Sequence, residues 1–458
     1  MRPSSSPSEE AGGLFGGVLA RGAVAPAVSD RAWLQAMLDF EAALARAEAR
    51  AGLIGADDAR AITAAADADG FDLDALGAAA AATASPIVPL VRALTAAVDG
   101  PGAGHVHRGA TTQDVMDSAA MLVAHRALGP LLHDLAGAED AAAALADAHR
   151  DTVMAGRTLL QQALPVTFGL RAAGWLVALH EAGGRLAEVR DTRLAVQLGG
   201  AAGTLASLGD AGPEVLAHLA DELGLAEPVL PWHTNRTRPA ELAGALGAAA
   251  GVVAKIARDV TLLAQTEVGE AREDAPGRGG SSTLPHKRNP VAAVSALAAA
   301  MRAPGLVATM LGAMAQEHER AAGAWQSEWL TLRDLLSTVG SAAAWLRDCL
   351  EHLEVDPERM RANLALTHGA LLAERVTTAL APALGRQAAH ELVEEAAAAL
   401  TGSRDLGDVL RERPDVREHL SVEEIARLLD PSDYLGSAPE LIDRALRAHH
   451  DHRRLSRP

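Results

Sequence analysis

A loop rich in glycine, serine and cations, residues 277–290, has the side chains for proton transfer on an anion. It reads GRGGSSTLPHKRNP, so that Ser281 and Ser282 precede Lys287 and Asn289. Glycines allow such a loop to move, and Asn289 followed by proline suits the start of a helix. A phosphate-binding Gly-Lys-Ser/Thr loop and a Gly-x-Ser-x-Gly turn are both excluded by the residue order. A flexible linker would not explain the serines and cations, so we interpret the loop as a lid over an anionic substrate.

Three other polar segments carry side chains that suit an anionic substrate. They read GHVHRGATTQD at 104–114, GRTLLQQALP at 156–165 and PWHTNRTR at 231–238. Arginine forks match carboxylates in geometry and charge. Each segment alone also fits ordinary structure, namely a capped loop, a connection between helices and a solvated loop. The pair His105 and His107 has no third nearby ligand, so it is weak evidence for a metal.

Long helices are expected to position these segments, because the apolar residues are mostly Ala and Leu. One helix is predicted to begin after Ser29-Asp30 and to end at Gly52. Its predicted buried face is Trp33, Met37, Phe40, Leu44 and Ala47. Further helices are predicted over 168–196, over 239–271, from 290 onward and after Asp356-Pro357. The chain contains no convincing strand alternation, and it is predicted to be all-α.

Composition limits the class of protein and its partners. The 458 residues include 41 Lys and Arg against 59 Asp and Glu, a net charge of −18, and aromatic residues make up 2%. Such a chain can bury a large core, and its acidity disfavours nucleic acid or an anionic membrane as a partner. The single cysteine, Cys349, excludes an intrachain disulfide. The amino terminus is a poor signal peptide and the apolar stretches are predicted to be too short for a bilayer, so a cytoplasmic protein is expected.

Two chain segments are interpreted as boundaries. Residues 99–104, DGPGAG, interrupt the helical pattern and are predicted to end a first domain. The last ten residues, HHDHRRLSRP, are predicted to be a frayed surface tail.

The residues from Gly280 to Pro290 resemble the signature loop of the fumarase/aspartase superfamily. The chain is also similar to one branch of it, the bacterial 3-carboxy-cis,cis-muconate cycloisomerases. This resemblance covers most of residues 29–335 and is weaker at both ends. The segments that carry it are 29–52, 108–117, 157–175, 231–238, 255–289 and 316–329.

The resemblance implies an all-α subunit of three domains whose long central helices assemble a homotetramer with active sites shared between subunits. The expected domains are an N-terminal helical domain (1–104), a central long-helix bundle that carries the loop (105–350) and a C-terminal helical domain (351–458). The implied partner is a small polycarboxylate substrate, with no cofactor and no metal. An acidic protein can still attract such an anion to local cations, for which the candidates are Arg108, Arg157, Arg236, Lys287, Arg288 and Arg320.

The resemblance also implies roles for individual residues. Ser281 matches the proton-abstracting base, and Ser282 is assigned to catalysis beside it. Lys287 and Asn289 match contacts to a substrate carboxylate. The remaining residues assigned to substrate binding are His107, Arg108, Thr111, Thr112, Gln113, Thr158, Gln161, Arg236 and Arg320.

One departure from the superfamily pattern bears on the reaction. Many members have a histidine where this chain has Leu159, which cannot donate a proton. A leaving group that is a weak base needs no general acid, and a carboxylate, with a pKa of roughly 3.5 to 4.3, is such a group. This favours lactonisation of 3-carboxy-cis,cis-muconate to 4-carboxymuconolactone, with Ser281 as the proton-transfer group.

Two alternatives stay open at this point. Leu159 also suits a lyase that eliminates another weakly basic group, for example nitrite from nitrosuccinate to give fumarate. Gln162, Asn235 and Gln326-Ser327 stand where other polar residues are expected in well-known cycloisomerases, which leaves room for a different substrate. A structural protein without activity is disfavoured by the intact signature loop.

Overall fold

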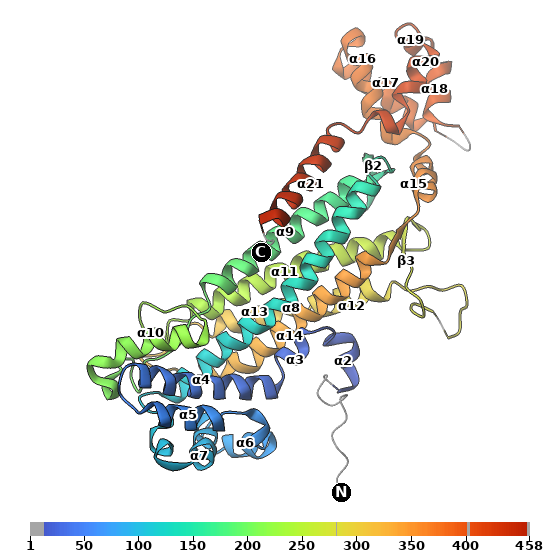
Figure 1. Ribbon diagram of the computed structural model, residues 1–458. Helices are drawn as coiled ribbons and strands as arrows, with labels where there is room; N and C mark the ends of the chain where they lie inside the picture. Colours follow the sequence, from blue (N-terminus) through green and yellow to red (C-terminus); the bar gives the residue numbers. More distant parts are fainter. Residues whose placement is uncertain (1–12, 281, 401–403, 456–458) are drawn as a thin grey trace. The chain divides into compact units, whose positions relative to one another are not determined.

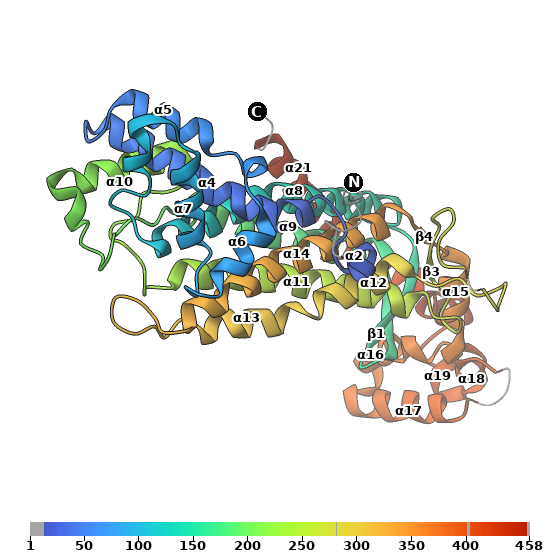
Figure 2. The ribbon, with the colours of Figure 1, turned by 90° about the horizontal axis from the view of Figure 1, so that it is seen from below.

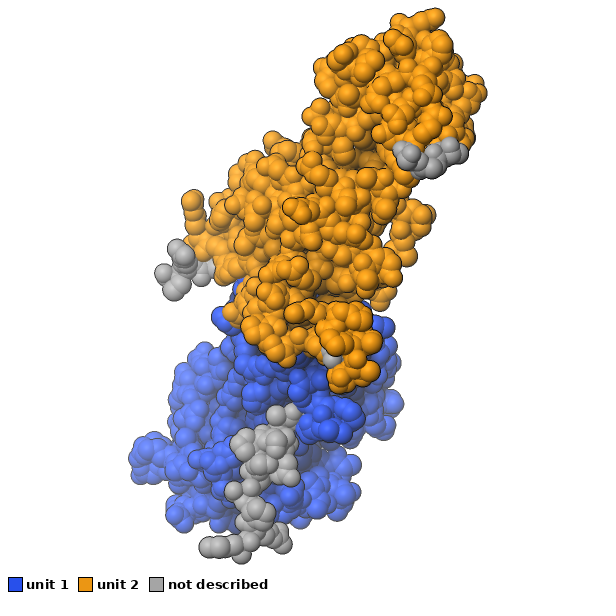
Figure 3. Space-filling view, turned by 90° about the vertical axis from the view of Figure 1, so that its right-hand side faces the viewer, with its two compact units in different colours: residues 1–136, 181–255, 295–346 blue, residues 137–180, 256–294, 347–458 orange. Residues whose placement is uncertain are grey.

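The computed structural model describes residues 13–280, 282–400 and 404–455, and helices make up most of them (Figure 1). The described residues form two compact units, which Figure 3 colours separately. Unit 1 comprises 1–136, 181–255 and 295–346, and unit 2 comprises 137–180, 256–294 and 347–458, in each case as far as these residues are described.

Four long helices contribute residues to both units, and the sequence predicted two of them, α9 and α11. They are α8 (Thr112–Ala148), α9 (Phe168–Thr192), α11 (Thr237–Leu263) and α14 (Ala324–Glu351). α11 begins two residues before Pro239 and ends well before residue 271. It therefore measures about 40 Å, whereas the predicted range 239–271 would measure about 50 Å. The chain after residue 290 forms α12 (Val291–Ala300) and α13 (Ala303–Gly312).

Unit 1 also contains shorter helices. They are α2 (Gly13–Leu19), α3 (Val24–Ala27), α4 (Asp30–Arg50), α5 (Ala56–Ala65), α6 (Leu73–Ala80), α7 (Ile87–Ala97) and α10 (Gly212–Leu223). α4 confirms its prediction, because the Ser29 hydroxyl accepts the Ala32 N–H and the predicted apolar face is buried. α5 and α10 both contact α4 (Figure 2).

The described part of unit 2 contains a further set of helices and four short strands. Its helices are α15 (Pro357–Leu364), α16 (Ala373–Leu384), α17 (Arg386–Ala398), α18 (Leu406–Glu412), α19 (Pro414–Arg417), α20 (Val422–Leu428) and α21 (Ala438–Leu455). α16 to α20 gather around a common apolar core that includes Leu380, Val393 and Leu410 (Figure 1). Asp356 caps α15 through the Arg359 N–H, as predicted.

The prediction of no strands is wrong for two antiparallel pairs in unit 2. β1 (Val153–Thr158) pairs with β2 (Gln161–Thr167), and β3 (Ala271–Glu273) pairs with β4 (Leu353–Val355). A bulge at Gly156 interrupts the first ladder, and a Cβ at this position would lie 2.7 Å from the Leu164 carbonyl oxygen. The protein is therefore mostly helical rather than strictly all-α.

The predicted C-terminal tail is also wrong over its described residues. His449 to Leu455 continue α21, and the buried His449 contacts the Glu139 carboxylate through Nδ1 at 2.9 Å. The expectation that the apolar stretches are too short for a bilayer is also wrong for two helical segments. Thr237–Leu263 and Val291–Gly312 are long and apolar enough to cross a membrane by length and composition alone, although more than half of the first window is buried inside the protein.

Candidate active site

The first polar segment is fixed at the amino end of α8. The Thr111 N–H donates to Asp114 Oδ2 at 2.9 Å. The Asp114 side chain thus binds the backbone of the residue that precedes α8, as in a capping box. Gly109 has a φ of 74°, and a Cβ there would lie 2.4 Å from the Leu208 side chain. Only glycine therefore allows this segment to pass so close to Leu208.

Arg320 is a positive charge held by neutral oxygens. Its guanidinium donates to Thr111 Oγ1 at 3.1 Å, to Gln113 Oε1 at 3.2 Å and to the Ala201 carbonyl at 3.3 Å. Among the described residues, no carboxylate forms an ion pair with it. Neutral acceptors orient a guanidinium without cancelling its charge, so Arg320 can attract a substrate carboxylate.

Asp114 joins three segments of unit 1. Its Oδ1 lies 2.6 Å from His233 Nε2 and accepts the Gly199 N–H at 3.0 Å, while Oδ2 accepts the Gly200 N–H at 2.9 Å. Asp114 and His233 are both buried. The carboxylate therefore ties the third polar segment, 231–238, to the amino end of α8.

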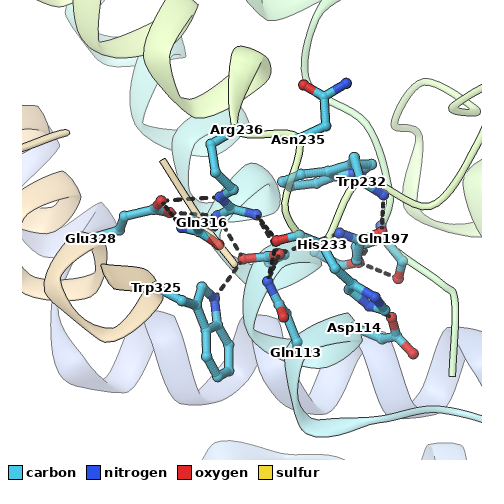
Figure 4. A network of polar contacts seen from close by, with 12 residues as sticks. Gln113, Asp114, Gln197, Trp232, His233, Asn235, Arg236, Gln316, Trp325 and Glu328 are labelled. Atoms are coloured by element: carbon cyan, nitrogen blue, oxygen red, sulfur yellow. Dashed lines mark hydrogen bonds and ion pairs between the residues drawn. The ribbon is translucent and has the colours of Figure 1, made fainter. Parts of the chain in front are cut away.

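Arg236 lies at the centre of a buried network, which Figure 4 shows. It donates two hydrogen bonds to Asp117, at 2.7 and 3.0 Å, and its Nε donates to Glu328 at 3.0 Å. The Trp325 indole N–H also donates to Asp117, at 3.0 Å. Burial lowers the pKa of Arg236, but the charges and hydrogen bonds of Asp117 and Glu328 outweigh it and hold this pKa above its usual value.

This geometry changes the expectation for Arg236 as a carboxylate ligand. Its guanidinium already binds two carboxylates and is only 3% exposed, so it is not available to a substrate. Trp232 packs in the same network, with the Arg236 guanidinium 5.0 Å from the centre of its ring. We therefore interpret Arg236 as a residue that positions α8, α11 and α14.

His107 and Arg108 are anchored on or near α4. His107 Nδ1 lies 2.7 Å from the buried Glu41 Oε1, and Arg108 Nη1 donates to the Leu53 carbonyl at 2.9 Å. Thr112 begins α8 and is half-buried. Unit 1 thus brings together the predicted residues of the first and third segments with Arg320.

The second polar segment forms the hairpin of β1 and β2 in unit 2. Thr158 and Gln161 face each other across its last rung, and Leu159 and Leu160 form the turn. Both leucines have positive φ angles, 51° and 66°, and Leu159 is 97% exposed. This backbone conformation favours asparagine and glycine, which explains why the turn was not recognised in the sequence.

Arg157, at the base of the same hairpin, has its charge neutralised. It donates to both oxygens of the fully buried Glu270, at 2.7 and 2.8 Å. Asn363 Nδ2 donates to the same carboxylate at 2.8 Å. Of the predicted cationic cluster, Arg157 and Arg236 are therefore structural ion-pair partners.

The two ends of the candidate lid, 277–290, lie close together through backbone contacts. The Asn289 N–H donates to the Gly279 carbonyl at 2.8 Å, and Gly280 bridges to Arg288. Glu273 caps α12 directly after the loop, because its oxygens accept the Ala292 and Ala293 N–H groups. Ser282, Lys287 and Asn289 are exposed, while Ser281 lies outside the described residues.

Several residues of the site were not identified from the sequence. Asp114, Asp117, His233 and Glu328 hold the network, and Glu270 holds the hairpin. The acidic residues at the start of α8 were the only available signal, and they also fit a plain helix cap. In the described part of the chain, no group of three His, Cys, Asp or Glu side chains could hold a metal ion.

Comparison with known proteins identifies the class. A family model described as "Lyase" matches residues 20–305, and one described as "Adenylosuccinate lyase C-terminus" matches residues 369–445. The chain belongs to this lyase family, part of the fumarase/aspartase superfamily.

Individual relatives narrow the comparison. The chain is 52% identical over 427 residues to a 3-carboxy-cis,cis-muconate cycloisomerase of Pseudomonas aeruginosa, which spans 92% of this chain and 93% of the relative. It is 46% identical over 447 residues to a nitrosuccinate lyase of Streptomyces davaonensis, spanning 95% and 94%. The crystal structure of a 3-carboxy-cis,cis-muconate lactonizing enzyme from Pseudomonas putida is 46% identical, with a TM-score of 0.91 over 96% of this chain and 99% of the other.

Proposed function

We propose that this protein catalyses the cycloisomerisation of 3-carboxy-cis,cis-muconate to 4-carboxymuconolactone. The structural observation that carries the proposal is Arg320, a cation beside Thr111 and Gln113 whose partners among the described residues are neutral oxygens. The similarity to cycloisomerases over nearly the whole chain supports the same reaction.

In the proposed mechanism, a substrate carboxylate attacks an alkene carbon and forms the ring C–O bond. The neighbouring carbon, which is α to another carboxylate, then carries enolate-like charge. Lys287 and Asn289 of the lid would stabilise this charge. Ser281 would donate its proton to that carbon and recover one from solvent. The trianionic substrate thus takes up one proton overall and gives a dianionic lactone.

Leu159 is consistent with this chemistry. Read in reverse, the leaving group is a carboxylate, a weak base that departs without a general acid. Thr158 and Gln161, beside Leu159 on the hairpin, are proposed to contact the substrate. No step of this mechanism requires a cofactor or a metal.

Elimination of nitrite from nitrosuccinate is the second candidate, which the 46% identical relative favours specifically. Incubating the purified chain with each compound separates the two. Loss of the absorbance of carboxymuconate without release of nitrite supports cycloisomerisation, whereas appearance of fumarate and nitrite supports the lyase. Turnover of neither compound would contradict both.

The assembly is proposed to be a cytoplasmic homotetramer of three-domain subunits, divided at 1–104, 105–350 and 351–458, with each active site shared between subunits. Exposed apolar side chains on and after α12 and α13 support such an assembly, since a partner subunit would cover them. They include Val294, Met301, Leu311 and Met314. Sedimentation of the purified chain as a monomer would contradict the tetramer.

Replacing Arg320 with Gln is expected to weaken substrate binding. The variant keeps a hydrogen-bonding side chain but loses the charge, so KM should rise roughly 10- to 100-fold, as expected for one charged contact of about 1.5–3 kcal/mol. Steady-state kinetics with carboxymuconate measures this change.

Arg238→Gln is the matched control for this experiment. Arg238 also donates to a neutral carbonyl, that of Arg193 at 2.7 Å, but it takes no part in the contacts around Arg320. Its KM should stay within about twofold of the wild type, the scale of a surface substitution. Equal KM values for both variants would remove Arg320 from the substrate site.

A further inference from the structure

Glu48 is a buried carboxyl group whose two oxygens have no hydrogen-bond partner in the part of the chain that the structure describes. It lies in the last two turns of α4 with no exposed surface, and Glu41 lies two turns earlier on the same helix and is 2% exposed. An unpaired buried carboxylate is costly, so a glutamate in this position needs a reason.

Arg108 is a cation of another segment whose charge acts on Glu48. This guanidinium opposes the effect of burial on Glu48, but its Nη1 donates to the Leu53 carbonyl instead of to the carboxyl group. Leu53 follows α4 directly, and its own N–H donates to the Glu48 carbonyl at 2.8 Å. Arg108 therefore lies within electrostatic reach of Glu48 without bonding to it.

Burial, only partly offset by Arg108, raises the pKa of Glu48 to about 7, and the nearby Glu41 raises it further in the same direction. The other charged groups around it are engaged elsewhere. Glu41 binds His107, His105 faces Asp58 of α5, and Arg46 and Arg50 bind Glu222 and Asp221 of α10.

Glu41 fixes the residue that precedes Arg108. Burial lowers the pKa of His107, but the hydrogen bond and charge of Glu41 outweigh it and raise this pKa above its usual value. His107 also has a φ of 60°, a conformation that few side chains adopt without a tertiary contact. Because Glu41 holds His107, we expect a change in the direction of Arg108 to involve its side chain and not its backbone.

We propose that Glu48 is a positioning residue that sets the direction of Arg108 according to its own protonation. With a neutral Glu48, Arg108 donates to Leu53 and leaves its other N–H groups for a substrate carboxylate. With an ionised Glu48, the guanidinium turns to form the buried ion pair, and the substrate loses one contact. The inference rests on the proposed function, because Arg108 is assigned to the substrate only by the superfamily resemblance that supports this function.

The pH dependence of KM tests this proposal. For the wild type, KM should rise about tenfold from pH 6 to pH 8.5, the equivalent of one contact of about 1.4 kcal/mol, with kcat less affected. Glu48→Gln cannot ionise, so its KM should stay at the low-pH level. Glu139→Gln, which changes a buried carboxylate of unit 2, should keep the wild-type rise. Persistence of the rise in Glu48→Gln would overturn the proposal.

A thermal readout keeps the test independent of turnover. A glutamate with a raised pKa stabilises the fold only while it is protonated, so this stability is lost as the pH rises from about 4.5 to above 7. The melting temperature of the wild type should therefore fall more steeply than that of Glu48→Gln between pH 5 and pH 8. Parallel curves would overturn the titration of Glu48 even if the substrate assignment failed.

A second variant serves if Glu48→Gln does not fold. Arg108→Gln removes the group that moves, so its KM should be raised at low pH and should show no further rise near pH 7. Its melting temperature should still fall with rising pH, but over a range shifted to higher pH, because Glu48 still titrates and has lost the charge that lowers its pKa. A KM step near pH 7 in Arg108→Gln would overturn the proposal.

Discussion

Replacing Ser281 with Ala is expected to lower kcat by about 10³-fold while KM changes little. The proposed mechanism uses its hydroxyl to move the proton, and a positioned general acid or base contributes roughly 10²- to 10⁴-fold. Alanine removes the hydroxyl and adds nothing that could disturb the exposed neighbouring residues. Single-turnover kinetics with carboxymuconate, together with the hydrodynamic size of the variant, measures the effect on chemistry alone.

Two serine controls sharpen this experiment. Ser282→Ala changes the next residue of the same lid and should cost less, because the superfamily resemblance places the base at the first serine. Ser432→Ala, an exposed serine of unit 2, should leave kcat unchanged. Near-normal turnover of Ser281→Ala would remove this residue from the mechanism, and a larger loss in Ser282→Ala would transfer the role to Ser282.

Replacing Arg236 with Met is expected to destabilise unit 1 by about 3–5 kcal/mol, since removal of one partner leaves buried charges uncompensated. Asp117 would keep only hydrogen bonds from Trp325, Gln113 and Gln197, and Glu328 would keep only that from Gln316. Equilibrium unfolding in urea, followed by tryptophan fluorescence, should show the lower midpoint.

Arg185→Met is the matched control for the Arg236 experiment. Arg185 pairs with Glu188 at the surface of α9, where both side chains are more than half exposed. Such a pair contributes about 0–1 kcal/mol, so the midpoint should hardly move. If Arg236→Met is as stable as this control but raises KM strongly, Arg236 binds substrate as the sequence suggested.

The helical parts of the fold could be predicted because local signals agree with packing. α4 has a serine cap, a face of apolar residues at helical spacing and a glycine after its end, and each of these appears in the structure. α15 likewise begins after its aspartate cap. These signals depend on neighbours in the sequence, so one chain read alone contains them.

The β1–β2 hairpin could not be predicted for a corresponding reason. Its strands lack regular alternation, and its turn uses Leu159 and Leu160 where asparagine and glycine are usual. The pairing of Arg157 with Glu270 contributes to the hairpin, and these residues are far apart in the sequence. Tertiary contacts therefore decide the local structure here.

The candidate site could likewise be predicted only in part. The sequence marked the polar segments, but it could not distinguish Arg320, with neutral partners, from Arg236, with two carboxylates. That distinction depends on Asp117 and Glu328, which come close to Arg236 only in the folded chain. Residue type indicated where carboxylates could bind, and only burial and partners indicate which cations remain available.

The neutral oxygens that bind Arg320 also have a thermodynamic consequence for the unliganded protein. Arg320 is half-buried and has no counterion among the described residues, which is an electrostatic cost that a bound carboxylate would relieve. Folding and binding are then linked by mass action, since a ligand present at 100 times its Kd adds about 2.7 kcal/mol to the stability of the folded state. In a cell, the abundance of this protein would thus depend on the concentration of the metabolite that it consumes.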